Sequence, residues 1–174
     1  MRLVNKVADS RWKIVSAVGL VWLVLDQLTK AAVTASIPLN HGFSVIPGFF
    51  DLVHVLNRGA AFGFLNRSDT DWQFWLFLAA AVAVTLVIVN MVRTANYSRL
   101  FFFGCGSILG GAIGNLIDRI RARAVTDFLD IYVGQWHWPA FNVADIAICL
   151  GVGATALVLL REIREESESR QKGE

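Results

Sequence analysis

The sequence predicts an all-α membrane protein, a four-transmembrane-helix bundle with a small extracytoplasmic β-sheet and a short interfacial helix. Hydrophobic residues make up 55% of the 174 residues and charged residues only 17%, which is too apolar for an ordinary soluble domain. The apolar residues gather in runs close to the roughly 20 residues that a helix needs to cross a bilayer. We therefore expect one integral membrane domain over residues 1–174, with spans at 14–33, 72–92, 100–120 and 141–160.

The basic residues predict the orientation of the bundle. Of the 16 Lys and Arg residues, most lie before the first span, between the second and third spans, or in the charged tail 161–174. Positive residues favour the cytoplasmic side, so we expect both termini there and the segments 34–71 and 121–140 outside. The net charge of +2 is too small to indicate a nucleic-acid partner. We expect the tail to be solvated and frayed.

The segment 34–71 is longer than a simple connector and predicts a small folded unit. Stretches rich in Val, Phe and Ile at 42–46 and 49–56 flank the turn signal Pro47-Gly48, which predicts a pair of strands. The stretches 128–133 and 136–138 are candidates for further strands. Residues 60–65 are short and apolar, so we expect a helix that lies on the membrane.

Apart from Asn90, near the inner end of the second span, the charged and amide side chains considered inside the predicted spans gather at one depth, in the outer third of the bundle. Polar groups are expensive in hydrocarbon, so this clustering indicates an enclosed polar site. The residues concerned are Asp26 and Lys30 of the first span, Asn115, Asp118 and Arg119 of the third, and Asn142 and Asp145 of the fourth.

Some of these side chains have structural interpretations. Asp26 and Lys30 are four residues apart and are expected to form a buried ion pair or to support the site. Asp118 and Arg119 are adjacent, point in different directions and are expected to tether the neighbouring loop. The two asparagines could donate hydrogen bonds to a carboxylate or a substrate, or could simply join helix to helix.

Asp127 and Asp145 are the candidate catalytic residues. Asp145 has no basic residue at helical spacing to neutralise it, and Arg123, four residues before Asp127, is expected to face lipid headgroups. Two carboxyl groups close together in a partly desolvated pocket cannot both ionise, so one can act as a general acid while the other activates water. Which aspartate plays which part stays open at this point. This chemistry needs no metal and no cofactor.

Five segments of the chain resemble motifs of the bacterial lipoprotein signal peptidases, also called signal peptidase II. They are Asp26-Gln27 with Lys30, the stretch Asn57-Arg58-Gly59-Ala60-Ala61-Phe62, the stretch 110–119, Val125-Thr126-Asp127-Phe128, and Phe141-Asn142-Val143-Ala144-Asp145. The sequence departs from the family at Arg123, where a glycine is expected, and this puts the local path of the loop in question.

The resemblance implies an intramembrane aspartic endopeptidase of the bacterial inner membrane, with its active site near the outer face. It would cut the signal peptide from diacylglyceryl-modified prolipoproteins immediately before the lipidated cysteine. It also implies membrane lipids and the peptide inhibitor globomycin as partners, and we expect a monomer. Asp127 and Asp145 would be the catalytic pair, and the residues that bind substrate or support the pair would be Asn57, Gly59, Asn115, Asp118, Arg119, Asn142, Asp26 and Lys30.

Two other functions are compatible with parts of this pattern. Intramembrane acids also mark proton- or ion-coupled transporters, although four short spans show no evident inverted repeat. A scaffold subunit is a third alternative, but it would not need unpaired acids at one depth.

Overall fold

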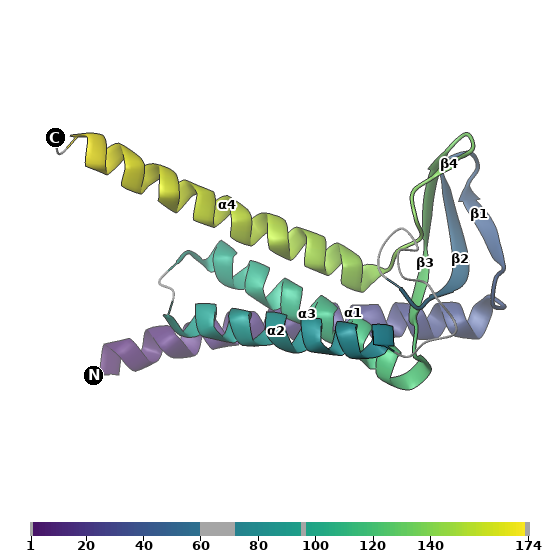
Figure 1. Ribbon diagram of the computed structural model, residues 1–174, viewed down its shortest axis with the longest axis horizontal. Coiled ribbons are helices and arrows are strands. Elements are labelled where there is room, and N and C mark those ends of the chain that lie inside the picture. The colour runs from purple at the N-terminus through teal and green to yellow at the C-terminus, as the bar shows by residue number, and fades with distance from the viewer. Residues whose placement is uncertain (1, 60–71, 95–96, 173–174) are drawn as a thin grey trace.

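Four long helices form the body of the computed structural model, which describes residues 2–59, 72–94 and 97–172. They are α1 (Arg2–Ser36), α2 (Trp72–Thr94), α3 (Arg99–Ala122) and α4 (Val143–Lys172). All are long and apolar enough to cross a membrane, which confirms the predicted fold class. The start of α1 and the end of α4 lie at one end of the bundle, and a sheet lies at the other (Figure 1).

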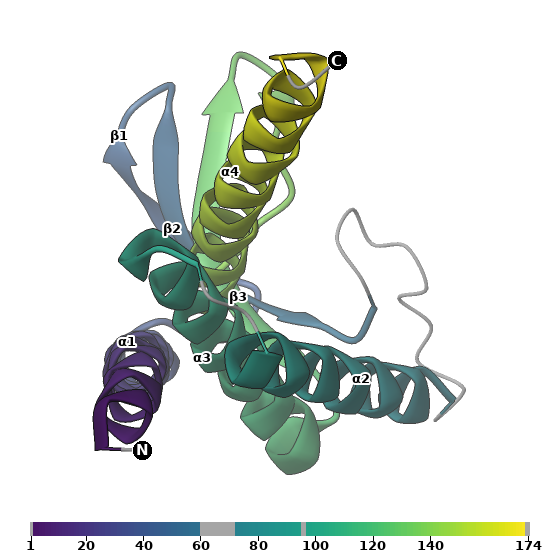
Figure 2. The same cartoon turned by 90° about the vertical axis from the view of Figure 1, so that its left-hand side faces the viewer.

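Helix α3 lies at the centre of the bundle because its glycines allow close approach of its neighbours. Figure 2 shows α1, α2 and α4 on different sides of α3, with α2 and α4 diverging from one another. A Cβ atom on Gly110 would lie 2.5 Å from the carbonyl oxygen of Gly19 in α1. Glycine at such positions lets helix backbones pack closely in a membrane, where hydrophobic burial does not drive helices together.

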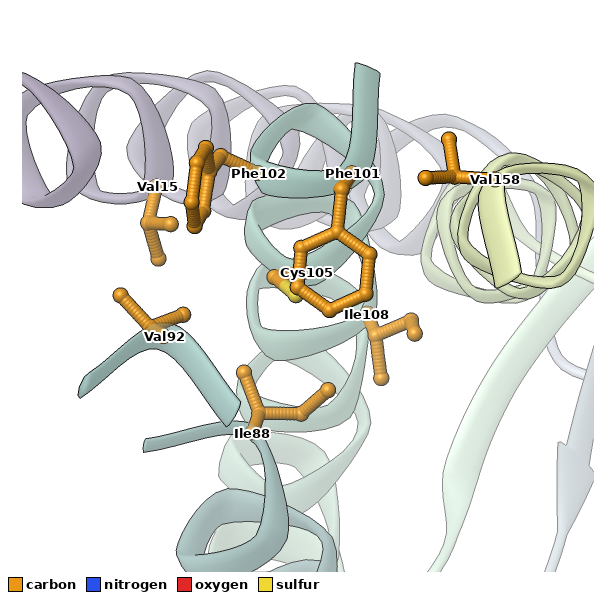
Figure 3. Packing of buried hydrophobic residues seen from close by; sticks show 8 residues of the cluster. All are labelled: Val15, Ile88, Val92, Phe101, Phe102, Cys105, Ile108 and Val158. Atoms are coloured by element: carbon orange, nitrogen blue, oxygen red, sulfur yellow. The ribbon is translucent and has the colours of Figure 1, made fainter. Parts of the chain in front are cut away.

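An apolar cluster fills the half of the bundle farthest from the sheet (Figure 3). Side chains from all four helices meet in it, namely Val15, Ile88, Val92, Phe101, Phe102, Cys105, Ile108 and Val158. The outward faces of the helices also carry large apolar side chains: Leu20, Leu86 and Leu160 are each more than 60% exposed. This pattern is typical of helices that face lipid.

The strands form one antiparallel sheet in the order β1-β2-β3-β4, and they run across the direction of the helices (Figure 1). They are β1 (Gly42–Ile46), β2 (Phe50–Asn57), β3 (Val125–Val133) and β4 (Trp136–His137). The predicted pair of strands around Pro47-Gly48 is confirmed. Phe128 packs against Val33 and Ile37, which fixes the sheet to the end of α1.

Three sequence-based expectations need correction or stay open. The candidate strand 128–133 begins earlier than expected, at Val125, so Asp127 lies within β3, opposite Val55 of β2. The tail is not frayed: α4 continues to Lys172 through residues that favour helices, and Arg164 Nε lies 2.8 Å from Glu168 Oε1. The predicted interfacial helix at 60–65 lies outside the described residues.

Candidate active site

The structure brings both candidate catalytic aspartates to one cavity of about 550 Å³ between the sheet, α3 and α4. Asp127 reaches it from β3 and Asp145 from the first turn of α4. Much of the remaining wall is apolar and includes Val125, Phe141 and Ile146. Four of the other predicted site residues also line this cavity: Asn57, Gly59, Asn115 and Arg119.

Asn142 and Asp145 cap the start of α4 reciprocally. The Oδ1 atom of Asn142 accepts a hydrogen bond from the backbone N–H of Asp145 at 3.0 Å, and Oδ2 of Asp145 accepts one from the N–H of Asn142 at 3.2 Å. This is the capping-box arrangement, with an acid at the third helical position. The positive end of the helix dipole and the backbone N–H of Asn142 interact favourably with the Asp145 carboxylate.

Asp127 is held by two amide donors in a buried position. Asn57 Nδ2 donates to its Oδ2 at 3.0 Å, and Asn142 Nδ2 donates to its Oδ1 at 2.6 Å. Burial raises the pKa of Asp127 from 3.8 to about 6, and the negative charge of Asp145 adds to the rise, while both hydrogen bonds oppose it. Asp127 therefore holds its proton to a higher pH than an ordinary aspartate does.

Both asparagines that the sequence left open donate to aspartates. Asn115 Nδ2 donates to Asp145 Oδ1 at 2.9 Å. Asn142 Nδ2, besides its bond to Asp127, lies 3.2 Å from Asn115 Oδ1. One amide network therefore links α3, β3 and α4 and fixes the two carboxyl groups relative to each other.

Lys30 is the centre of a buried charge network beneath the aspartate pair. Its Nζ lies 2.9 Å from Asp26 Oδ2, which confirms the expected ion pair, and 3.0 Å from Asp118 Oδ2. It also donates to Asn115 Oδ1 at 3.0 Å. Asp26 in turn accepts a hydrogen bond at 3.0 Å from the backbone N–H of Ala144. The network thus joins α1, α3 and the start of α4.

Asp118 and Arg119 point in different directions, as expected from their adjacent positions, toward β3 and toward the segment after β2. Asp118 Oδ2 accepts a hydrogen bond from the backbone N–H of Thr126 at 3.1 Å. Arg119 donates to the carbonyl oxygen of Gly59 at 3.1 Å, and its guanidinium lies 4.1 Å from the ring centroid of Phe77. The end of α3 is therefore hydrogen-bonded to the start of β3 and to the segment that follows β2.

At position 123, where the family pattern predicts glycine, the backbone adopts a conformation that favours glycine. Arg123 caps α3 in the left-handed conformation, with φ 56°, where glycine is the residue that fits without strain. Its guanidinium lies 3.9 Å from the ring centroid of Phe74. Stacking on an aromatic face is worth about 0.5–1 kcal/mol at an exposed site and offsets part of the strain. The side chain thus packs on α2, whereas the sequence analysis expected it to face lipid headgroups.

Gln27 contacts the charge network around Lys30 but is not among the site residues predicted from the sequence. Its Nε2 lies within 3.3 Å of Asp26 Oδ2, Asp118 Oδ1 and the carbonyl oxygen of Gly114. A Cβ atom on Gly114 would lie 2.5 Å from Asp26 Oδ2, so the close approach of Asp26 to α3 requires glycine at position 114. The sequence does indicate a buried role for Gln27, because it is a polar residue within an apolar run. The spacing Asn142-x-x-Asp145 likewise indicated a cap.

A four-span bundle with an acid pair in an apolar cavity defines a multi-pass membrane enzyme. In the part of the chain that the structure describes, no three His, Cys, Asp or Glu side chains come together to hold a metal ion. The sequence model of the family described as signal peptidase (SPase) II matches residues 18–161. The chain belongs to this family, and it is a peptidase.

Named relatives and solved structures agree with this assignment. The chain is 56% identical to a lipoprotein signal peptidase of Oleidesulfovibrio alaskensis, with 87% of this chain and 97% of that protein covered. It is 50% identical to one of Nitratidesulfovibrio vulgaris, with 92% and 98% covered. A solved bacterial membrane enzyme is similar in structure, with a TM-score of 0.75, 26% identity, and 84% of this chain and 87% of that chain covered.

Proposed function

We propose that this peptidase removes the signal peptides of diacylglyceryl-modified prolipoproteins and cuts the bond immediately before the lipidated cysteine. The relatives carry the name lipoprotein signal peptidase, which supports this substrate class. The observation that carries the proposal is that Asp127 and Asp145 line one cavity with apolar walls and are joined through Asn142. Such a cavity suits a substrate that arrives through the bilayer as an apolar helix. The transporter alternative loses its basis because the family is a peptidase family.

Water activated by Asp145 is the nucleophile in the mechanism that we derive. Asp145 accepts a proton from water, whose oxygen attacks the scissile carbonyl carbon, while Asp127 gives its proton to the developing oxyanion. When the carbon–nitrogen bond breaks, the proton on Asp145 passes to the leaving amine. A hydroxyl of the tetrahedral intermediate returns a proton to Asp127 as the carbonyl group re-forms. The raised pKa of Asp127, caused first by its burial, supports its role as the acid. The donors on Asp145 support its role as the base.

The cellular setting follows from the charge pattern and the placement of the site. We place the protein in the bacterial inner membrane with both termini in the cytoplasm and the cavity near the outer face. A tag on the tail 161–174 should therefore resist protease added outside intact cells. We also propose that the enzyme acts as a monomer and that globomycin competes with substrate for the cavity.

The test is cleavage of a synthetic lipidated precursor by the reconstituted wild type, Asp127→Asn and Asp145→Asn. Loss of either acid should lower kcat by about 10²–10⁴-fold, as expected for general acid–base residues. Asp130→Asn is the matched control, since Asp130 lies on the same strand but pairs with His137. Mass spectrometry of the product should find the lipidated cysteine at its new N-terminus. Near-normal turnover by either variant of the pair would refute the mechanism.

A further inference from the structure

A second cavity of about 280 Å³ lies beside the first, between α2, α3 and α4. Asn115, Arg119 and Ile148 line both cavities, so the two spaces adjoin at these residues. The lining residues come from α2, α3 and α4, so the cavity lies between α2 and α4, which diverge from one another beside α3 (Figure 2). In a membrane, the space between these two helices faces hydrocarbon.

Apart from Asn115 and Arg119, the side chains that line the second cavity are apolar, and three of them are alanines. On α2 the lining residues are Phe77, Ala80, Ala81 and Val84, which share one helical face. The distance from the first to the last of them along the helix is about 10 Å at 1.5 Å per residue. Ala112 and Leu116 of α3 also line it. We call this space, lined by residues of 77–84, 112–116 and Ile148, the acyl slot. Its length and lining suit a hydrocarbon chain.

The end of the acyl slot nearest the aspartates carries a donor that lacks an acceptor. Arg119 stacks on Phe77, and two of its nitrogens bond to the carbonyl oxygens of Gly59 and Asn115. Its Nε is buried with no hydrogen-bond partner among the described residues. A buried donor without an acceptor is unfavourable, so a ligand that brings an acceptor is favoured here. An ester carbonyl followed by an acyl chain supplies both the acceptor and the hydrocarbon.

We propose that the acyl slot takes one acyl chain of the substrate's diacylglyceryl group, with the ester carbonyl of that chain at Arg119. The inference rests on the proposed function, in which the lipidated residue adjoins the scissile bond. The glyceryl group then lies close to the aspartate pair, and its chains must leave the first cavity for hydrocarbon. The residues shared by the two cavities mark that exit. Because lipid already surrounds an acyl chain, the slot aligns the substrate more than it adds affinity.

The test pairs a substitution inside the slot with the same substitution outside it. Ala81→Leu adds three carbon atoms to the slot, whereas Ala83→Leu adds them to an exposed position of α2 that does not line it. Both variants and the wild type are assayed with lipopeptides that carry either two palmitoyl or two acetyl chains. Ala81→Leu should lose about 10–100-fold in kcat/KM on the palmitoyl substrate, since a misplacement of about 1 Å costs about that much. It should match the wild type on the acetyl substrate, which also shows that it is folded.

Photo-cross-linking locates the chain without turnover. The inert Asp127→Asn variant is irradiated with a lipopeptide that carries a diazirine on one acyl chain, and the labelled residues should fall within 77–84 or 112–116. Labels on α1, equal losses on both substrates, or labelling by a diazirine phospholipid that the lipopeptide does not displace would overturn the proposal. If the wild type cleaved neither substrate, the proposed function would fail, and the cross-links would still decide whether the slot binds the chain.

Discussion

Replacement of Asp127 by Asn should change how the stability of the protein depends on pH. The side chain is only 3% exposed, and burial is the main reason that its pKa lies at about 6 instead of 3.8. Below pH 3.8 the carboxyl group is protonated in both the folded and the unfolded protein. As the pH rises from there, the unfolded protein loses its proton first, so the free energy of unfolding falls until the folded protein also ionises near pH 6. At 1.36 kcal/mol per pH unit, the total loss is about 3 kcal/mol.

The assay is reversible unfolding in mixed micelles at pH 3.5 and pH 7.5 for the wild type and Asp127→Asn. The amide cannot ionise, so the variant should gain about 3 kcal/mol relative to the wild type between the two pH values. The constant cost of placing an amide opposite the donors of Asn57 and Asn142 cancels in this double difference. Glu168→Gln, in the exposed part of α4, is a control that should show little change.

A difference between variant and wild type that stays constant from pH 3.5 to pH 7.5, within about 0.5 kcal/mol, would refute the reasoning, since the linkage requires the full effect. It would mean that Asp127 ionises in the folded protein as readily as in the unfolded one. The proposed division of labour would then lack its basis, because Asp127 could not be the member that keeps the proton. Catalytic loss alone would not detect this error.

Three further predictions follow from named contacts. Lys30→Met should cost about 3–5 kcal/mol, since it leaves two buried carboxylates without their cation, and a variant that unfolds like the wild type would contradict this. Arg123→Gly should be about 1 kcal/mol more stable than Arg123→Ala, because only glycine relieves the left-handed backbone; equal unfolding midpoints would show no strain there. Asn57→Ala removes a donor that lowers the pKa of Asp127, so the alkaline limb of the kcat/KM profile should move to higher pH, not lower.

The sequence predicted the bundle because a bilayer leaves few structural choices. A run of about 20 apolar residues must form a helix to satisfy its backbone hydrogen bonds, so four runs gave four spans. The strand that carries Asp127 was not predicted from its first residue. Its partner Asn57 lies 70 residues away, and α2 and α3 stand between β2 and β3 in the sequence. Hydropathy cannot predict such a pairing, since it depends on the three-dimensional arrangement.

The depth of the polar residues predicted the site, but not which side chain contacts which. Depth follows from position along each helix, so Lys30 and Asp118 were placed at one level from the sequence. Their 3.0 Å contact depends on how α1 and α3 are rotated. That rotation is set by close backbone contacts such as Gly19 with Gly110, which hydropathy does not report. The stacking of Arg123 on Phe74 was missed for the same reason.

The start of α4 shows why helix capping and the aspartate pair form one unit. A helix begins with backbone N–H groups that need acceptors. Here Asp26 accepts from Ala144 and Asn142 accepts from Asp145, and both caps belong to the network around the pair. The amide of Asn142 also donates to Asp127. The residue that caps α4 therefore also positions the second acid, Asp127. A substitution of Asn142 should therefore destabilise α4 and separate the two carboxyl groups in the same step.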